Sequence, residues 1–242
     1  MLVTGGATGI GAAVSRVLLE RGARVAVAQR SHAELTDALE ESGLQGRVEA
    51  VAADLATAAG CRDVVADAVK ALGGLDGLVN NAAATGPTVR RNLRDMDDDY
   101  VDWVVDLNLK AVLRCSREAA GVMPSGSVIV SVASVLAQAP QPQAALYTAS
   151  KAGVVALMKA LAVELGPCGI RTVSVSPGDI DTAASVAPDP DPIVAARAVR
   201  SSVLARRGTA REVADAVAYL LSDSASYITG TDLLVDGGYL LT

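Results

Sequence analysis

Short apolar runs alternate with longer amphipathic stretches along this chain, and the alternation predicts how it folds. The runs are rich in Val, Leu, Ile and Ala and predict strands at residues 2–4, 24–28, 47–52, 76–80, 127–132, 170–176 and 231–235. Between them, apolar residues recur at helical spacing in stretches that include 11–21, 57–72, 99–120, 147–166 and 211–222. This alternation is typical of a parallel sheet with helices on both faces.

The order of these elements predicts an α/β fold with a doubly wound, mostly parallel sheet of seven strands. Ligands of such folds bind at the carboxyl ends of the strands. The chain has 242 residues, which fits one domain over residues 1–242. Alternating prolines between Ala187 and Pro192 favour a loop, and we expect residues 183–207 to form a lid over the substrate.

Charge and composition exclude several classes of protein. The chain carries 21 Lys and Arg against 27 Asp and Glu, a net charge of −6, and no basic cluster, which argues against a nucleic-acid partner. No apolar run reaches the roughly 18 residues of a membrane span and no secretory signal precedes the first glycines, so we expect no membrane partner and a cytoplasmic location. The three cysteines, Cys61, Cys115 and Cys168, lie far apart without the spacing of metal ligands, so we expect buried free thiols and no metal site. We expect the single histidine, His32, to lie on the surface.

A glycine-rich turn links the first predicted strand to the first helix. Its sequence is Thr-Gly-Gly-Ala-Thr-Gly-Ile-Gly, residues 4–11. Glycines let the backbone approach a pyrophosphate, and the following helix N-terminus adds unpaired N–H groups and the positive end of its dipole. The turn therefore predicts a dinucleotide site.

Tyr147 and Lys151 stand four residues apart at the head of an apolar helical stretch, with Ser134 thirteen residues upstream. This spacing places both side chains on one helix face, where an ammonium favours the ionised phenol. A tyrosine of pKa about 10 needs a shift of a few units to act as a base near neutrality. The set predicts a proton-transfer site, although Tyr147 could be an ordinary core residue and Ser131 could replace Ser134.

Taken in order, the motifs resemble those of the short-chain dehydrogenase/reductase family over residues 2–238. They are Thr4-Gly5-xxx-Gly9-x-Gly11, Asp54-Leu55, Asn80-Asn81-Ala82-Ala83, Asn108, Ser134, Tyr147-xxx-Lys151, Pro177-Gly178-xxx-Thr182 and Val235-Asp236-Gly237-Gly238. The resemblance implies a Rossmann fold with Tyr147 as general acid or base. Lys151 would lower its pKa and hold the nicotinamide ribose, Ser134 would bind the substrate oxygen, and Asn108 would anchor a water that links Lys151 to solvent. The family's serine-to-tyrosine interval of thirteen favours Ser134 over Ser131.

The resemblance also implies a set of cofactor contacts. They are Gly5, Thr8, Gly9, Ile10, Gly11, Arg30, Ser31, Asp54, Leu55, Asn80, Ala82, Tyr147, Lys151, Pro177, Gly178, Ile180 and Thr182. After the second strand, uncharged Gln29 precedes Arg30, whose guanidinium can pair with a 2′-phosphate, and this favours NADP(H). NAD(H) stays open, because Arg30 could be a solvated charge and Thr8 replaces the family's second basic residue.

These features predict an NADP(H)-dependent oxidoreductase that transfers hydride between nicotinamide and a carbonyl or secondary alcohol. Residues 84–88 and 135–143 are mostly small and apolar, which favours a neutral ketone, a small or specialised metabolite. One alternative is a reductase of 3-oxoacyl thioesters of carrier protein or CoA, for which Arg90, Arg91 and Arg94 could form a docking patch. Another is a non-catalytic nucleotide-binding sensor or scaffold. The resemblance implies a homotetramer, or a homodimer, formed through the helices near 99–120 and 147–166 and the last strand.

Overall fold

Seven parallel strands form one sheet in the computed structural model, which describes residues 1–182 and 202–242. The strands are β1 Leu2–Thr4, β2 Ala26–Gln29, β3 Glu49–Ala52, β4 Gly77–Asn80, β5 Val128–Val132, β6 Arg171–Pro177 and β9 Asp232–Val235. They lie in the order β3-β2-β1-β4-β5-β6-β9, and each pair is parallel. The predicted doubly wound α/β fold is confirmed, with each of the seven predicted strands in place.

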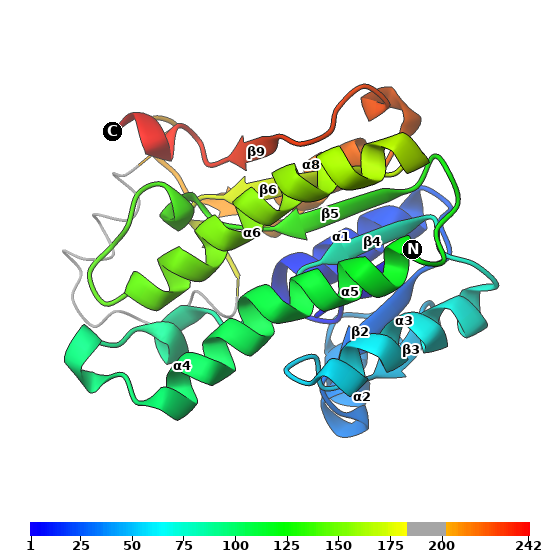
Figure 1. The fold of residues 1–242 in the computed structure, drawn as a ribbon, viewed down its shortest axis with the longest axis horizontal. Coiled ribbons are helices and arrows are strands. Elements are labelled where there is room, and N and C mark those ends of the chain that lie inside the picture. Colours follow the sequence, from blue (N-terminus) through cyan, green and yellow to red (C-terminus); the bar gives the residue numbers. More distant parts are fainter. Residues whose placement is uncertain (183–201) are drawn as a thin grey trace.

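Helices cover both faces of this sheet (Figure 1). They are α1 Gly9–Glu20, α2 His32–Glu41, α3 Ala58–Leu72, α4 Asp98–Val105, α5 Ala111–Ala120, α6 Ala145–Leu165 and α8 Ala210–Leu220. Alternate strand residues point to opposite faces. Val3, Val27 and Val79 therefore pack with α1, α2 and α8, whereas Leu2 and Leu78 pack with α3, α5 and α6. The two apolar layers hold the carboxyl ends of the strands in a fixed arrangement.

Two features depart from the sequence prediction. The helix expected over 99–120 is interrupted by a π-helical turn, Asp106–Lys110, which separates α4 from α5. A separate two-stranded sheet pairs β7 Ile180–Asp181 with β8 Gly208–Thr209, and these strands are too short to show a periodicity. Short 3-10 turns complete the described structure at Gly86–Val89, Leu93–Asp95, Val135–Ala137, Gly166–Cys168, Asp223–Ala225 and Tyr239–Leu241.

Most of the expected lid, residues 183–201, lies outside the described residues. The rest of it, 202–207, packs on the chain's last turn. Leu204 N donates to Gly237 O at 3.1 Å, and a Cβ on Gly238 would lie 2.8 Å from the Cβ of Val203. The segment that follows β9 therefore supports the base of the expected lid.

The cysteines follow the prediction only in part. Cys61 and Cys115 are buried, but Cys168 is exposed because it lies in the 3-10 turn after α6, so its predicted burial is wrong. His32 is exposed, as predicted. Among the described residues, one helical stretch, Ala145–Cys168, is long and apolar enough to cross a membrane by length and composition. This is weak evidence, since core helices of soluble proteins meet the same criteria.

Candidate active site

The hydroxyl of Tyr147 lies among other hydroxyl groups. Tyr147 is in the first turn of α6, and its pKa is lowered by the side chains of Thr85, which follows β4, and Ser134, which follows β5. Ser134 Oγ also accepts from Leu136 N at 3.2 Å. Ser131 is fully buried in β5, where its Oγ accepts from Asn80 Nδ2 at 3.2 Å. The structure therefore brings Ser134, and not Ser131, to Tyr147.

Thr85 is a candidate site residue that the sequence analysis missed, since it named residue 85 only within the stretch 84–88. Its position depends on Asn108, which is fully buried on the π-helical turn. Asn108 Oδ1 accepts from Ala84 N at 2.7 Å, and its Nδ2 donates to Ala84 O at 3.1 Å. The backbone N–H and C=O of Ala84 are both held in this way, so Asn108 fixes the backbone next to Thr85.

Lys151 lies one turn after Tyr147 on α6 and is only 3% exposed. Its Nζ donates to Val132 O, at the end of β5, at 2.8 Å and lies 5.8 Å from the centre of the Tyr147 ring. Burial lowers the pKa of Lys151 to about 8. The amine is therefore mostly protonated at pH 7 but can exchange its proton in the mildly alkaline range.

Burial raises the pKa of Tyr147, and the side chains of Thr85 and Ser134 oppose that rise. The lowering of this pKa by Lys151, which the resemblance implies, stays a prediction. The phenol is protonated at neutral pH, and in that state it can donate a proton to a bound oxygen.

The glycine turn sits at the carboxyl end of β1 and has no room for larger side chains. Gly5 and Gly9 have positive φ angles of 61° and 50°, which favour glycine. A Cβ on Gly11 would lie 2.1 Å from Gly5 O and 2.5 Å from Nδ2 of Asn81. That amide donates to Thr4 O at 3.0 Å and to Gly5 O at 3.1 Å, so Asn81, which the sequence analysis did not select, fixes the shape of the turn.

The start of α1 can hold an anion. Thr8 occupies the N-cap position and is exposed, and within the described chain its side chain makes no capping hydrogen bond. The first N–H groups of a helix, here those of residues such as Ile10, have no partner within the helix. A Cβ on Gly9 would lie 3.8 Å from the Cβ of Thr182, so the segment after β6 faces the turn. These features fit the pyrophosphate of a dinucleotide.

The residues expected at the adenosine end follow β2 and β3. Arg30 is exposed, and its Nε donates to Glu34 Oε1 at 3.1 Å, while a second contact joins Nη2 to the same oxygen. This hydrogen bond raises the pKa of Arg30. Ser31 caps α2 by accepting from Glu34 N. Asp54 Oδ1 accepts from Ala56 N at 3.1 Å and so closes its own turn, and the Leu55 side chain is buried.

The other predicted contacts divide between the sheet and its carboxyl edge. Asn80 is buried, and its Nδ2 donates to Ser116 Oγ at 3.1 Å as well as to Ser131, so it joins β4 to α5 and β5. Ala82 N donates to Thr4 Oγ1 at 3.1 Å beside the glycine turn. Further along the edge lie Pro177, Gly178 and Ile180; a Cβ on Gly178 would lie 2.8 Å from the Cα of Asp236, and the Ile180 side chain is buried in β7.

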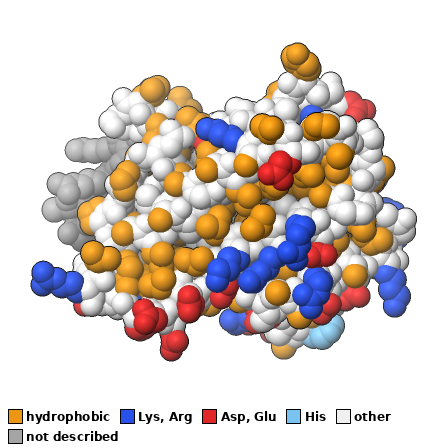
Figure 2. Space-filling model, viewed as in Figure 1, with side chains coloured by type: hydrophobic (Ala, Val, Ile, Leu, Met, Phe, Trp, Pro, Cys, Tyr) orange, Lys and Arg blue, Asp and Glu red, His pale blue; other side chains and the backbone are white. Residues whose placement is uncertain are grey.

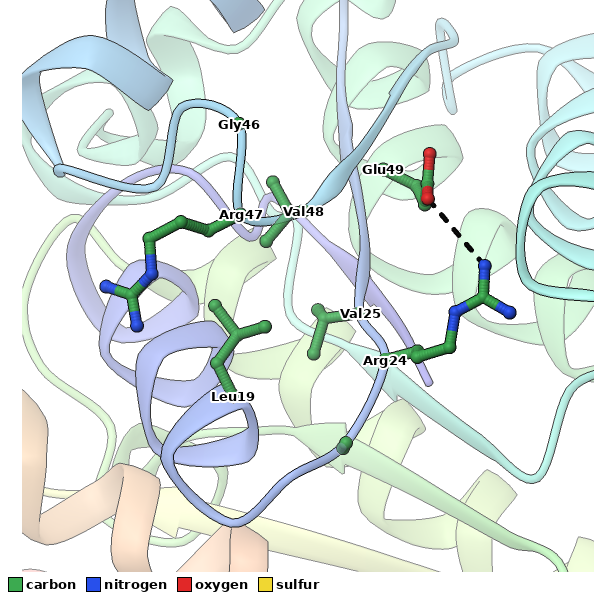
Figure 3. Close-up of a pocket in the computed structure, with 8 residues that line it drawn as sticks. Leu19, Arg24, Val25, Gly46, Arg47, Val48 and Glu49 are labelled. Atoms are coloured by element: carbon green, nitrogen blue, oxygen red, sulfur yellow. Dashed lines mark ion pairs between the residues drawn. The ribbon is translucent and has the colours of Figure 1, made fainter.

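A shallow hollow lies elsewhere, at the start of β2 and just ahead of β3 (Figure 3). It is lined by Leu19, Ala23, Arg24, Val25, Gly46, Arg47, Val48 and Glu49. Arg24 pairs with Glu49 at 3.8 Å across it. The hollow contains none of the proton-transfer residues and lies at the opposite end of the strands from the glycine turn, so we assign the chemistry to the carboxyl edge.

Comparison with known proteins gives relatives over nearly the whole chain. Residues 5–240 match the family described as enoyl-(acyl carrier protein) reductase. The cis-4-hydroxycyclohexanecarboxylate dehydrogenase of Sinomonas cyclohexanicum is 36% identical over 98% of this chain and 95% of its own. The 3-oxoacyl-[acyl-carrier-protein] reductase FabG of Staphylococcus aureus is 35% identical over 98% and 96%. A short-chain dehydrogenase from Burkholderia cenocepacia, solved in complex with NADP, superposes with a TM-score of 0.88 at 36% identity, over 99% of this chain and 96% of its own.

Proposed function

This chain belongs to the short-chain dehydrogenase/reductase family of oxidoreductases, and on that premise we propose that it is an NADP(H)-dependent ketone reductase in which Tyr147 is the general acid and base. One observation carries the proposal. Burial raises the pKa of the Tyr147 phenol, and the Ser134 side chain lies close enough to act on that pKa. A protonated phenol beside a second hydroxyl suits the protonation of a carbonyl oxygen during reduction.

In the proposed reaction the substrate carbonyl oxygen accepts hydrogen bonds from Ser134 and Tyr147. These bonds polarise the carbonyl and stabilise the charge that develops on its oxygen. A bound nicotinamide cofactor supplies hydride to the carbonyl carbon in reduction and accepts it in oxidation. Tyr147 gives its proton to the developing alkoxide, and in the reverse direction it takes the proton from the alcohol. Thr85 opposes the rise in the phenol's pKa that burial causes.

Lys151 and Asn108 support this step. With its pKa lowered to about 8 by burial, Lys151 can hold or release a proton close to the Tyr147 ring. Asn108 positions Thr85 by holding both polar groups of Ala84. Its expected second role, the anchoring of a water that links Lys151 to solvent, stays a prediction.

The chain's own residues would hold the cofactor along the carboxyl edge of the sheet. The glycine turn and the start of α1 would bind the pyrophosphate, and the residues after β6, Pro177, Gly178, Ile180 and Thr182, would bind the nicotinamide carboxamide. Arg30 is exposed after β2, where its guanidinium can pair with a 2′-phosphate. The NADP bound to the Burkholderia relative supports NADP(H) as the preferred cofactor, with NAD(H) second.

A neutral ketone is the substrate class we favour. The Sinomonas relative is named for a cyclic secondary alcohol that also carries a carboxylate, so it supports the alcohol and ketone chemistry and not the neutrality of the substrate. A second candidate is reduction of 3-oxoacyl thioesters, which the 35% identity to the Staphylococcus FabG protein favours. Two of the three arginines expected to form its docking patch already have partners within the chain. Arg90 donates to Gln141 at 2.9 Å, and Arg91 pairs with Asp97 at 3.2 Å and lies 4.1 Å from the Tyr100 ring centre. This weakens the case for an acidic carrier protein.

Turnover tests the proposal directly. Purified protein is given NADPH with cyclic ketones and, separately, with acetoacetyl-CoA, and loss of nicotinamide absorbance is followed. We expect Tyr147→Phe to lower turnover by a factor of about 10² to 10⁴ while leaving NADPH binding and the circular dichroism spectrum unchanged. Near-native turnover by a folded Tyr147→Phe variant would refute the assignment. Cofactor binding without hydride transfer to any ketone or thioester would instead favour the sensor class.

We further propose a cytoplasmic homotetramer. Exposed apolar side chains support this: Leu113 on α5 is 45% exposed, Val163 on α6 is 78% exposed and Leu234 on β9 is 40% exposed. Figure 2 shows hydrophobic side chains spread over the face that α5 and α6 form. Size-exclusion chromatography with light scattering tests the state, and a monomer at micromolar concentration would contradict it.

A further inference from the structure

The guanidinium proposed to bind the 2′-phosphate already has a carboxylate partner. Both Nε and Nη2 of Arg30 donate to Oε1 of Glu34, one turn further along α2. Arg30 has 69% of its side chain exposed and Glu34 has 43%, so the pair lies at the surface where a nucleotide can reach it. One of the two edges of the guanidinium that can form a two-point contact with a phosphate, the edge of Nε and Nη2, is therefore in use.

Glu34 is held in this place by its own helix. It is the third residue of α2, and its N donates to the Ser31 Oγ of the N-cap at 3.3 Å. A carboxylate in the first turn of a helix is favoured by the helix dipole. The backbone of Glu34 is thus fixed, and only its side chain can rotate away from Arg30. Asp54 is a second carboxylate that acts on the Arg30 charge, from the end of β3.

Binding of a 2′-phosphate to Arg30 is opposed by Glu34 in either of two ways. The phosphate either displaces the Glu34 carboxylate, losing the Arg30 contact, or binds beside it and is repelled by a like charge. A nucleotide with a free 2′-hydroxyl meets neither cost, because it does not need the guanidinium edge. The cost therefore falls on NADP(H) and not on NAD(H).

We propose that Glu34 is a specificity-determining residue that competes with the 2′-phosphate for Arg30 and weakens the preference of this protein for NADP(H) over NAD(H). The proposal rests on the cofactor site given under the proposed function. It makes cofactor preference the result of two opposed side chains, Arg30 and Glu34, four residues apart.

Calorimetry with 2′,5′-ADP and with ADP tests this without any substrate. Glu34→Gln keeps the length and the N-cap bond but removes the charge, and Glu40→Gln is the matched control on the same helix, exposed like Glu34 but outside the pair. We expect Glu34→Gln to bind 2′,5′-ADP about tenfold more tightly than the wild type, with ADP affinity changed less than twofold, since charge-assisted bonds to Arg30 become available to the phosphate. Glu34→Ala should behave alike, and Glu40→Gln should match the wild type.

A double variant tests whether the effect of Glu34 acts through Arg30. In Arg30→Ala with Glu34→Gln the gain for 2′,5′-ADP should vanish, and added salt should reduce the gain in the single variant. Unchanged or weaker 2′,5′-ADP binding by both Glu34 variants, with ADP still bound, would overturn the inference and leave the cofactor site standing. Failure of every protein to bind either nucleotide would overturn the proposed cofactor site, and the inference with it.

Discussion

Burial of the Lys151 ammonium should destabilise the unliganded protein in a pH-dependent way. Its pKa is about 8 in the folded state, whereas an unfolded chain has the ordinary value near 10.5. Below pH 8 both states are protonated, and folding carries the full cost of burying the charge. Between pH 8 and 10.5 the unfolded chain binds the extra proton, so stability rises with pH. The difference of about 2.5 pH units corresponds to about 3 kcal/mol.

Replacing this lysine with methionine keeps the length of the side chain and removes the charge. The variant also loses the bond to Val132 O, which costs about 1 kcal/mol. We expect Lys151→Met to be more stable than the wild type at pH 7 by about 2 kcal/mol, and this advantage to disappear by pH 10. The pH dependence is the decisive quantity, because the loss of the hydrogen bond contributes equally at every pH.

Urea unfolding at pH 7, 8, 9 and 10 measures this, at one protein concentration so that any assembly contributes equally. Lys159→Met is the control, because Lys159 lies exposed on the same helix. Its stability should follow that of the wild type throughout. A constant difference between the wild type and Lys151→Met across this range would refute the reasoning, because it would mean that the ammonium is not held at a lowered pKa.

Two further predictions concern the residues that shape the site. Thr85→Val removes one of the two hydroxyls that lower the pKa of Tyr147, which makes the phenol a weaker acid, so kcat/KM for ketone reduction should fall about fivefold. Thr85→Ser keeps the hydroxyl and should retain activity. An equal fall in both variants would contradict the role of the hydroxyl. Gly11→Ala places a methyl 2.1 Å from Gly5 O and should lose at least about tenfold in NADPH affinity and about 2 kcal/mol in stability. Gly74→Ala is its control, since a Cβ there meets nothing within 4 Å, and equal NADPH affinity in both variants by calorimetry would contradict the steric argument.

The sheet and the ordering of its helices could be predicted because buried parallel strands and amphipathic helices leave strong periodic patterns. The π-helical turn at Asp106–Lys110 leaves no such pattern, since its residues suit an α-helix equally well. The pairing of Tyr147 with Ser134 was expected from a motif interval. The proximity of Tyr147 to Thr85 was not expected, because it depends on the hold of Asn108 on Ala84 and on packing between the loop after β4 and the start of α6.

The electrostatics were the least predictable part of the site. Identity and spacing placed Lys151 near Tyr147, but the burial that lowers one pKa and raises the other depends on the packing of several elements. In the same way, the sequence offered Arg30 as a phosphate ligand without showing that Glu34 occupies it. Both charges have an i,i+4 spacing that is common on helix surfaces, so the pattern alone gave no reason to select the pair.

The pairing of the central strand, β1, has a consequence for how the chain folds. β1 is three residues long, and it pairs with residues 26–28 on one side and with Leu78 and Val79 on the other. The second partner is more than seventy positions away along the chain, so closing that loop costs much entropy before any contact is gained. A nascent chain leaving the ribosome would hold β1 unpaired on that side until β4 has emerged. We expect the docking of β4 on β1 to be the slow step of folding, and the nucleotide site, which is built on the loops after these two strands, to form only once that step is complete.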